Sequence, residues 1–492
     1  MQWLKTKTIE QALADSDEPG RQLKRSLGVF DLMILGVAVA VGAGIFSVGA
    51  RAAGSFAGPA VIFSFILAAA TCAVATMCYA EFASSVPVTG SAYTYTYLTM
   101  GEGVAWIIGW NLLLEMIAAG AVIAKYWGIY LSTVFATAGW HVPSTLHLGP
   151  VDVEWGPFVI VAVFTVLLML GTKASARVNN VFTLIKIAIT LFVIVVGFTY
   201  MDVKNFTPFV PPAQPPAIGH GVTGDVWGQP MLAWLFGAVP SQYGWLGVIS
   251  GASLVFFAFI GFDVVATSAE EVKEPQKTLP RGIFGGLALV TLLYILVTLA
   301  LTGMVPYAEL AKAENPSLAT AFLSVGATWA AQVIAVGVLL GLTTVVMVLL
   351  MGSARILLAL CRDGLLPRSW SVTSAERKTP VRLQLVVGVI IAALAGFTRV
   401  ELLEEMINIG TLSAFVLVSI AVLVMRRKRP DMPRGYRVPL VPWLPVASAL
   451  LCTYLMLNLT TLTWLRFLLW MAIGVLVYLA YGMRHSRLAQ KH

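Results

Sequence analysis

The chain has 492 residues and a formal net charge of +8, and 58% of its residues are hydrophobic whereas only 11% are charged. A soluble globular chain carries about 25% charged residues, so this composition excludes an ordinary water-soluble domain. A basic balance can indicate nucleic-acid binding, but here the basic residues flank apolar blocks, as in the run from Arg426 to Arg429. We therefore expect a lipid bilayer and no nucleic acid as partner.

Twelve apolar blocks follow one another along the chain. They cover 28–52, 59–85, 102–135, 155–172, 178–200, 246–269, 281–304, 329–360, 382–398, 402–426, 441–459 and 462–482. Each approaches or exceeds the ~20 residues that cross the hydrocarbon as a helix. The first 27 residues are polar, so the first block is expected to be a spanning helix and not a cleaved leader. This pattern predicts an all-α polytopic membrane protein with 12 transmembrane helices.

The lysines and arginines between the blocks predict the orientation in the membrane. If the N-terminus is cytoplasmic, the inward segments hold 25 Lys and Arg residues and the outward segments hold 5. Such a bias places both termini in the cytoplasm and the chain in the cytoplasmic (inner) membrane as a multi-pass protein. The longest outward loop, 201–245, is rich in proline and carries three tryptophans, which is typical of turns with interfacial aromatics.

Two of the blocks contain glycine at matching places. The first block has Gly42 and Gly44 at mid-membrane depth, and the sixth has Gly261 followed by Asp263. Glycine weakens a helix interior by about 1 kcal/mol relative to alanine. The first block opens one set of five blocks and the sixth opens the next five. Interruptions at corresponding places in two halves indicate an inverted-repeat transporter whose site lies near the midplane.

Unwound backbone offers a specific chemistry. It frees N–H groups that can hold a carboxylate, helped by the positive end of a half-helix, and carbonyls that can hold an ammonium. A zwitterionic amino acid carries both charges on one carbon and suits such a site. Glycine also lets membrane helices pack closely, and this alternative stays open on the residues alone.

Several motifs give the sequence a family resemblance. Residues 42–46, Gly-Ala-Gly-Ile-Phe, resemble the G-x-G-I-F motif in the first helix of the amino acid–polyamine–organocation (APC) superfamily. Segments 79–82, 87–93, 260–263 through 270–272, 362–367 and 408–411 are similar to its cationic amino acid transporter family. The likeness covers about residues 20–485 and is less specific for the substrate than for the superfamily.

The resemblance implies a LeuT-type fold with a 5+5 inverted repeat, discontinuous helices 1 and 6, and peripheral helices 11 and 12. The expected divisions are a cytoplasmic tail (1–27), a first repeat (28–200), an extracytoplasmic loop (201–245), a second repeat (246–426), helices 11–12 (427–483) and a cytoplasmic tail (484–492). The implied function is a secondary active transporter for L-amino acids, with proton-coupled symport by alternating access. A small single-helix membrane partner is compatible with the family.

The resemblance also implies a set of binding residues. The substrate carboxylate would meet N–H groups around Ala43, Gly44 and Ile45. The substrate amino group would meet the carbonyls of Val41, Phe257, Ala258 and Ile260. Many relatives have Ser or Thr where this chain has Ala43, so here the backbone alone would hold the carboxylate.

Charged residues inside the blocks are functional hypotheses, because burying a charge in the bilayer costs at least a few kcal/mol. Glu115 matches a family position near the pocket for the substrate side chain. Lys186 matches a family lysine thought to link protonation to helix 1, and burial favours its neutral form, so it can lose and regain a proton. A permanently charged lysine that pins helix 5 to carbonyls is the alternative. Lys125 lies toward the outer end of its block, where we expect it to snorkel.

Other functions find less support. The five histidines lie outside the apolar blocks, and H-E-x-x-H and G-x-S-x-G motifs are absent from the sequence, so we expect no enzyme, metal or cofactor. A filter ring or polar pore face, which a channel needs, is not evident. An exchanger and a non-transporting amino acid sensor stay open. Block 8 offers Met347, Leu349, Leu350 and Met351, which favours neutral, alanine-like substrates over cationic ones.

Overall fold

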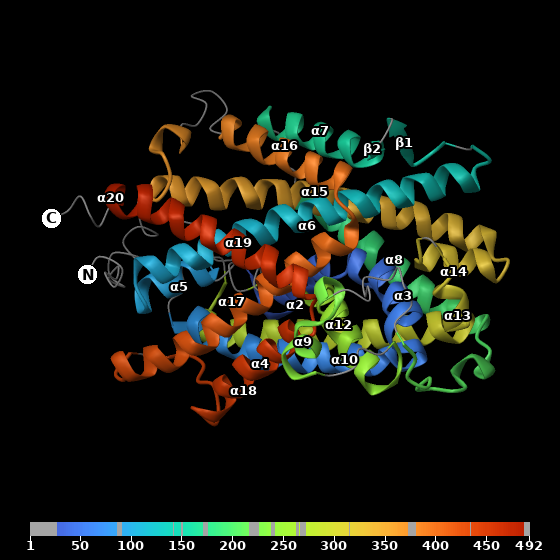
Figure 1. Ribbon diagram of the computed structural model, residues 1–492, viewed down its shortest axis with the longest axis horizontal. Helices are drawn as coiled ribbons and strands as arrows, with labels where there is room; N and C mark the ends of the chain where they lie inside the picture. Colours follow the sequence, from blue (N-terminus) through green and yellow to red (C-terminus); the bar gives the residue numbers. More distant parts are fainter. Residues whose placement is uncertain are drawn as a thin grey trace.

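The computed structural model shows how the apolar blocks are arranged (Figure 1). It describes residues 27–85, 91–140, 142–148, 151–170, 176–215, 226–237, 242–261, 265, 272–313, 315–371, 380–432 and 434–486. Asp263 lies outside these residues.

Helices make up most of the described chain. The first half contains α2 (Val29–Ala40), η2 (Gly44–Val48), α3 (Gly49–Ala52), η3 (Ala53–Ala57), η4 (Gly58–Ala60), α4 (Val61–Ser85), α5 (Ser91–Thr99), α6 (Glu102–Thr137), α7 (Trp155–Met169), α8 (Ala176–Thr199), η5 (Val203–Phe206), η6 (Val226–Gly228) and α9 (Met231–Phe236). The second half contains α10 (Gly244–Val255), η7 (Phe256–Phe259), α12 (Pro275–Met304), α13 (Tyr307–Leu310), α14 (Leu318–Ser324), α15 (Thr328–Arg362), η9 (Arg368–Ser371), α16 (Val381–Phe397), α17 (Val400–Lys428), α18 (Trp443–Leu457), α19 (Thr461–Val477), η10 (Tyr478–Gly482) and α20 (Met483–His485).

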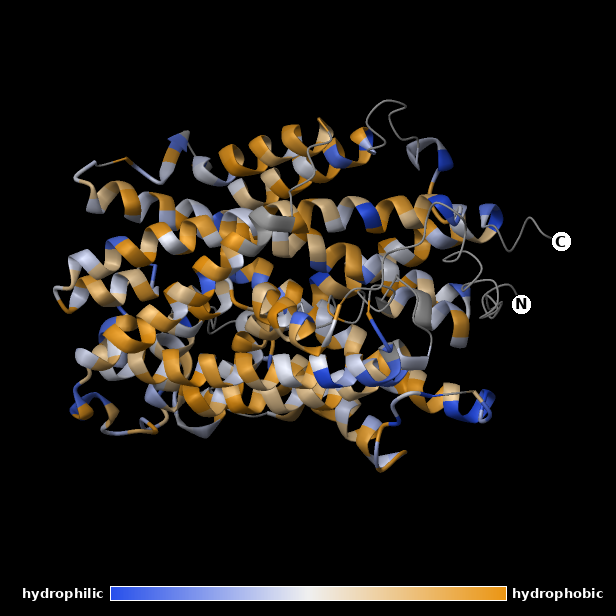
Figure 2. Cartoon of the chain, turned by 180° about the vertical axis from the view of Figure 1, so that it is seen from behind, coloured by the Kyte–Doolittle hydropathy of each residue, from blue (hydrophilic) through white to orange (hydrophobic). Residues whose placement is uncertain are grey.

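The helices have the lengths and composition of a membrane protein. Seven stretches of described helix are long and apolar enough to cross a bilayer, and five apolar helices of 10–17 residues accompany them. Every one of the twelve predicted blocks contains at least one of these helices. Apolar residues run along the bodies of the helices and polar ones gather toward the ends (Figure 2). The chain is therefore a multi-pass membrane protein.

Several elements between the predicted blocks were not expected from the sequence, among them a helix and a β-hairpin. Helix α5 lies between the second and third blocks, and strands β1 (Thr145–Leu148) and β2 (Val151–Glu154) form an antiparallel hairpin between the third and fourth. The hairpin pairs Thr145 with Glu154 and Leu148 with Val151. In Figure 1, α5 and α20 lie at one end of the molecule, and the hairpin, α13 and α14 lie at the other.

Helix α6 is the centre of the packing and contacts α15, α17, α7 and α16, whereas α2 and α4 pack against α12. Helix α19 is also fixed to α6. The Trp106 Nε1–H donates to the carbonyl of Gly474 at 2.8 Å, and the Trp110 Nε1–H donates to that of Trp470 at 2.9 Å. The rings of Trp110 and Trp470 stack with centroids 4.5 Å apart. The helix expected to be peripheral is thus bound on its inner face by specific hydrogen bonds.

Candidate functional site

The first apolar block is interrupted where its glycines predict. Helix α2 ends at Ala40, Val41 takes an extended conformation with ψ of 98°, and the helix resumes at Gly44 as a π-helical turn. The hydrogen bond from the Phe46 N–H to the Gly42 carbonyl is long, at 3.4 Å. Residues 43–45 precede Phe46 and form the first turn of the resumed helix. The N–H groups of a first helical turn lack intrahelical partners.

The sixth block is interrupted in a related way. Helix α10 ends at Val255, a 3₁₀ turn follows through Phe259, and Ile260 is extended with ψ of 140°. Gly261 then has φ of 108°, a left-handed conformation that side chains rarely adopt. The interruption predicted in the first block is confirmed. In the sixth block the described helix ends before Gly261, at the predicted place, and residues 262–264 and 266–271 lie outside the described part of the chain.

The two interruptions touch each other. A Cβ atom placed on Gly44 would lie 2.5 Å from the Cα of Ala258, and one on Gly261 would lie 2.3 Å from a methyl carbon of Val39. Gly44 is therefore required by the close approach of the Ala258 backbone, and Gly261 by its positive φ and by the Val39 side chain. The predicted contact residues of the two segments are buried together, with Ile260 half-buried at the edge.

Tyr294 of α12 joins the two interruptions, and the sequence analysis missed it. Its hydroxyl is 2.6 Å from the carbonyl oxygen of Ala40 and 2.7 Å from that of Ala258. One hydroxyl has a single proton, so the two carbonyls share one donor. The buried ring also packs edge-on against Phe65 and Phe259. In the sequence, the only indication of this bridging role is a polar hydroxyl in the middle of an apolar block.

Two more side chains bind the interrupted segments. The Asn408 Nδ2–H of α17 donates to the carbonyls of Ser253 at 2.9 Å and Leu254 at 3.3 Å, just before the 3₁₀ turn. The Tyr130 hydroxyl of α6 donates to the Phe46 carbonyl at 2.8 Å. Asn408 belongs to the motif at 408–411, which had been recognised without a role. Backbone carbonyls freed by the interruptions are thus held by neighbouring helices.

Lys186 reaches the first interrupted helix from α8. Its Nζ donates to the carbonyl of Ala38 at 3.0 Å, three residues before the interruption begins. The side chain is 4% exposed and passes Gly341 of α15, where a Cβ would lie 2.9 Å from the lysine Cγ. The structure thus places this ammonium on helix 1. This contact fits both the coupling hypothesis and the structural alternative.

Glu115 and Lys125 both lie on α6. Glu115 is buried, and Asn111 one turn earlier donates to the Gly410 carbonyl of α17 at 2.6 Å. Lys125 is 3% exposed; its Nζ lies 2.6 Å from Glu154 Oε1 and 3.1 Å from the Ala395 carbonyl. The expectation that Lys125 snorkels is wrong, because a carboxylate at the start of α7 neutralises the ammonium inside the protein.

The resumed half of the first helix carries a buried ion pair. Arg51 of α3 pairs with Glu404 of α17, and the Tyr126 hydroxyl of α6 donates to the same carboxylate at 2.6 Å. The Glu404 carboxylate is fully buried, whereas the nearby Glu401 is partly exposed and lies 3.7 Å from Arg51. This network ties the resumed half of the first helix to α6 and α17.

Comparison with known proteins identifies the family. The profile described as "Amino acid permease" matches residues 27–482. The chain belongs to the amino acid permease family. The resemblance to the APC superfamily is confirmed by this match and by relatives named as cationic amino acid transporters.

Three relatives show how this permease compares along its whole length. A methylthioribose transporter of Bacillus subtilis (strain 168) is 41% identical over 487 residues, and the branched-chain amino acid permease BcaP of the same organism is 40% identical over 491 residues. Each alignment covers 98% of both chains. The vacuolar cationic amino acid transporter 4 of Arabidopsis thaliana is 29% identical, over 97% of this permease and 94% of that protein. These names agree with the expectation of a transporter and not an enzyme.

Proposed function

We propose that this permease is a secondary active transporter that moves neutral L-amino acids across the cell membrane by alternating access. The contact between the two interrupted helices is the observation that carries the proposal. It packs the start of η2, where helix N–H groups lack intrahelical partners, against Ala258 of η7, the segment whose carbonyls the proposal assigns to the substrate ammonium. Carboxylate and ammonium of one amino acid need these two kinds of group side by side.

The proposed substrate is apolar in its side chain. The α15 residues expected beside it are Met347, Leu349, Leu350 and Met351, which supply no charge for a cationic group. A relative 40% identical over its whole length is named a branched-chain amino acid permease. We therefore place leucine, isoleucine, valine and alanine before arginine and lysine.

A second candidate substrate is methylthioribose, because a relative 41% identical over its whole length is named for it. This sugar derivative is uncharged and would use neither a carboxylate site nor an ammonium site. The backbone groups around Gly44 and Ala258 favour the amino acid.

The topology and coupling belong to the same proposal. Twelve spanning helices would form a 5+5 inverted repeat followed by α18 and α19, with both termini cytoplasmic and the divisions given above. A proton would be the coupling ion. Loss of the proton from Lys186 would weaken its charged hydrogen bond to Ala38 and so loosen α2 beside the interruption.

The decisive experiment is uptake into proteoliposomes that contain the purified permease. Labelled leucine, alanine, arginine and methylthioribose are each supplied under an acid-outside proton gradient, and counterflow is measured without a gradient. We expect leucine or alanine to accumulate, with empty liposomes as the control. Accumulation of arginine alone would reverse the assignment and give Glu115 the role of its counter-ion. Accumulation of methylthioribose alone would select the second candidate, and binding without counterflow would indicate a sensor.

A further inference from the structure

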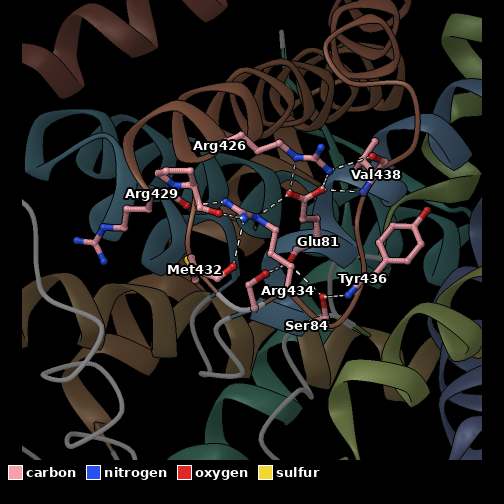
Figure 3. Close-up of polar contacts among 10 residues, drawn as sticks. Glu81, Ser84, Arg426, Arg429, Met432, Arg434, Tyr436 and Val438 are labelled. Atoms are coloured by element: carbon pink, nitrogen blue, oxygen red, sulfur yellow. Dashed lines mark hydrogen bonds and ion pairs between the residues drawn. The ribbon is translucent and has the colours of Figure 1, made fainter.

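A buried cluster ties the connection between α17 and α18 to the end of α4 (Figure 3). The Glu81 carboxylate is fully buried and accepts hydrogen bonds from Arg426 Nε at 2.9 Å and Arg426 Nη2 at 2.7 Å. It also accepts from the Val438 N–H at 2.7 Å, and Arg434 Nε lies 3.3 Å from its other oxygen. Glu81 thus holds two arginines and a loop backbone.

The same cluster folds the connection into a fixed shape. The Arg434 guanidinium donates to the carbonyls of Arg429, Pro430 and Met432. In Figure 3 the side chain of Arg429 extends away from Glu81. Arg426 and Arg434 point inward and direct their guanidinium groups to Glu81 and to backbone carbonyls. The basic side chains that remain are turned outward.

The exposed side chains around the connection between α17 and α18 include both basic and apolar residues. Arg427, Lys428 and Arg437 are exposed. Leu440 is 75% exposed and Trp443 is 76% exposed. We call these five residues the basic–apolar surface. Leu440 has φ of 49°, a left-handed conformation that is strained for leucine.

The apolar part of this surface continues into a lipid-facing stripe. Beyond Trp443, the exposed residues Val446, Leu450 and Tyr454 follow along one face of α18 at helical spacing. Trp443 is the first residue of that helix, so it stands where the hydrocarbon-facing stripe ends. Tryptophan prefers the headgroup level of a bilayer. The start of α18 therefore marks the headgroup level, and the connection that carries the three basic residues leads directly into it.

We propose that the basic–apolar surface binds the headgroup of an anionic phospholipid, and that the Glu81 cluster holds the surface in the binding shape. Arg427, Lys428 and Arg437 contact the phosphate, while Leu440 and Trp443 enter the boundary with the acyl chains. The proposal is independent of which substrate the permease carries. Each basic residue near an anionic surface contributes about a fivefold factor in affinity, so loss of two should weaken binding roughly 25-fold.

The test measures lipid-dependent thermal unfolding of the full-length permease in a neutral detergent. All four cysteines are buried and form no disulfide, so a thiol-reactive dye reports unfolding. Phosphatidylglycerol and phosphatidylcholine are added at equal mole fractions. Because a ligand that binds only the folded state raises its stability, we expect phosphatidylglycerol to raise the Tm at least about 2 °C more than phosphatidylcholine does. Raising the salt concentration should shrink that difference.

Two charge-matched variants separate this surface from basic residues in general. Arg427→Gln/Arg437→Gln should lose most of the difference between the two lipids. Arg362→Gln/Arg382→Gln removes the same charge from exposed positions at another connection, and should keep the difference. Inorganic phosphate added without lipid should not replace phosphatidylglycerol, since it cannot reach Leu440 and Trp443 with an acyl chain.

Variants of the supporting cluster complete the test. Glu81→Gln keeps all three exposed basic residues but weakens the hold on Arg426 and Val438, so it should reduce the lipid difference as well as the Tm without lipid. Equal stabilisation of the native protein by both lipids would overturn the proposal. So would an undiminished difference in Arg427→Gln/Arg437→Gln.

Discussion

Substitution of Gly44 tests the contact on which the candidate site rests. In Gly44→Ala the new Cβ would lie 2.5 Å from the Ala258 Cα and 2.6 Å from its Cβ. Carbon atoms in contact prefer about 3.5–4.0 Å, so one segment must shift by about 1 Å. Overpacking of this kind costs about 1–3 kcal/mol. The higher helix propensity of alanine returns up to about 1 kcal/mol, which leaves a net loss of up to about 3 kcal/mol in the free energy of unfolding, and about 1.5 kcal/mol at mid-range.

Gly42 provides a matched control two residues earlier. A Cβ placed on Gly42 meets no described atom within 4 Å. Gly42→Ala should therefore be neutral, or stabilising by about 0.4–1 kcal/mol, because alanine restricts the unfolded chain. The assay is thermal unfolding of both variants, followed by uptake in proteoliposomes at matched protein amounts. We expect a lower Tm and impaired uptake for Gly44→Ala only. Equal Tm values for the two variants, with normal uptake by Gly44→Ala, would refute the close contact.

Three further outcomes can be measured with the same preparations. Tyr294→Phe keeps the ring but leaves two buried carbonyls without their shared donor, so it should cost about 1–3 kcal/mol of stability. Its uptake should fall further than that of Tyr130→Phe, which loses one such bond on one interrupted helix; equal uptake by the two would contradict a bridging role. Lys186→Met should abolish uptake driven by an acid-outside gradient while counterflow survives, and a gradient response like that of the native protein would make Lys186 structural. Lys125→Met should destabilise by leaving the Glu154 carboxylate without its cation, yet the remaining folded protein should still respond to the gradient.

The sequence predicted the interruptions because glycine acts through the local backbone. Gly44 and Gly261 are glycines in otherwise apolar blocks, and their matching positions in the two halves predicted that both helices are interrupted there. Which atoms they would touch could not be predicted, since the approach of Ala258 and Val39 depends on how two helices cross. The carboxylate was expected beside Gly44; the structure adds a protein neighbour there as a second reason for glycine.

Residues whose role depends on helix rotation escaped prediction. In a helix that is apolar on all sides, the sequence does not show whether Tyr294 faces lipid or the protein core. The packing of α12 against α2 and α4 turns it toward the carbonyls of Ala40 and Ala258. Lys125 was expected at the interface because it lies toward the outer end of its block, and its partner Glu154 stands just before the next block, where the sequence alone does not show that the two meet. Helix α5 was taken for a loop because its sequence, rich in serine, threonine and tyrosine, lacks an apolar run.

The tryptophans that bind α19 have a consequence for biosynthesis. The indole N–H groups of Trp106 and Trp110 receive their acceptors from residues 474 and 470, which the ribosome adds more than 350 residues later. An indole N–H without an acceptor is unfavourable inside a bilayer. Until α19 is made, Trp106 and Trp110 of α6 lack the acceptors that they have in the folded protein. The nascent protein therefore completes α6 only when its last helix inserts. A chain that stops before α19 leaves both indole N–H groups of α6 without these acceptors.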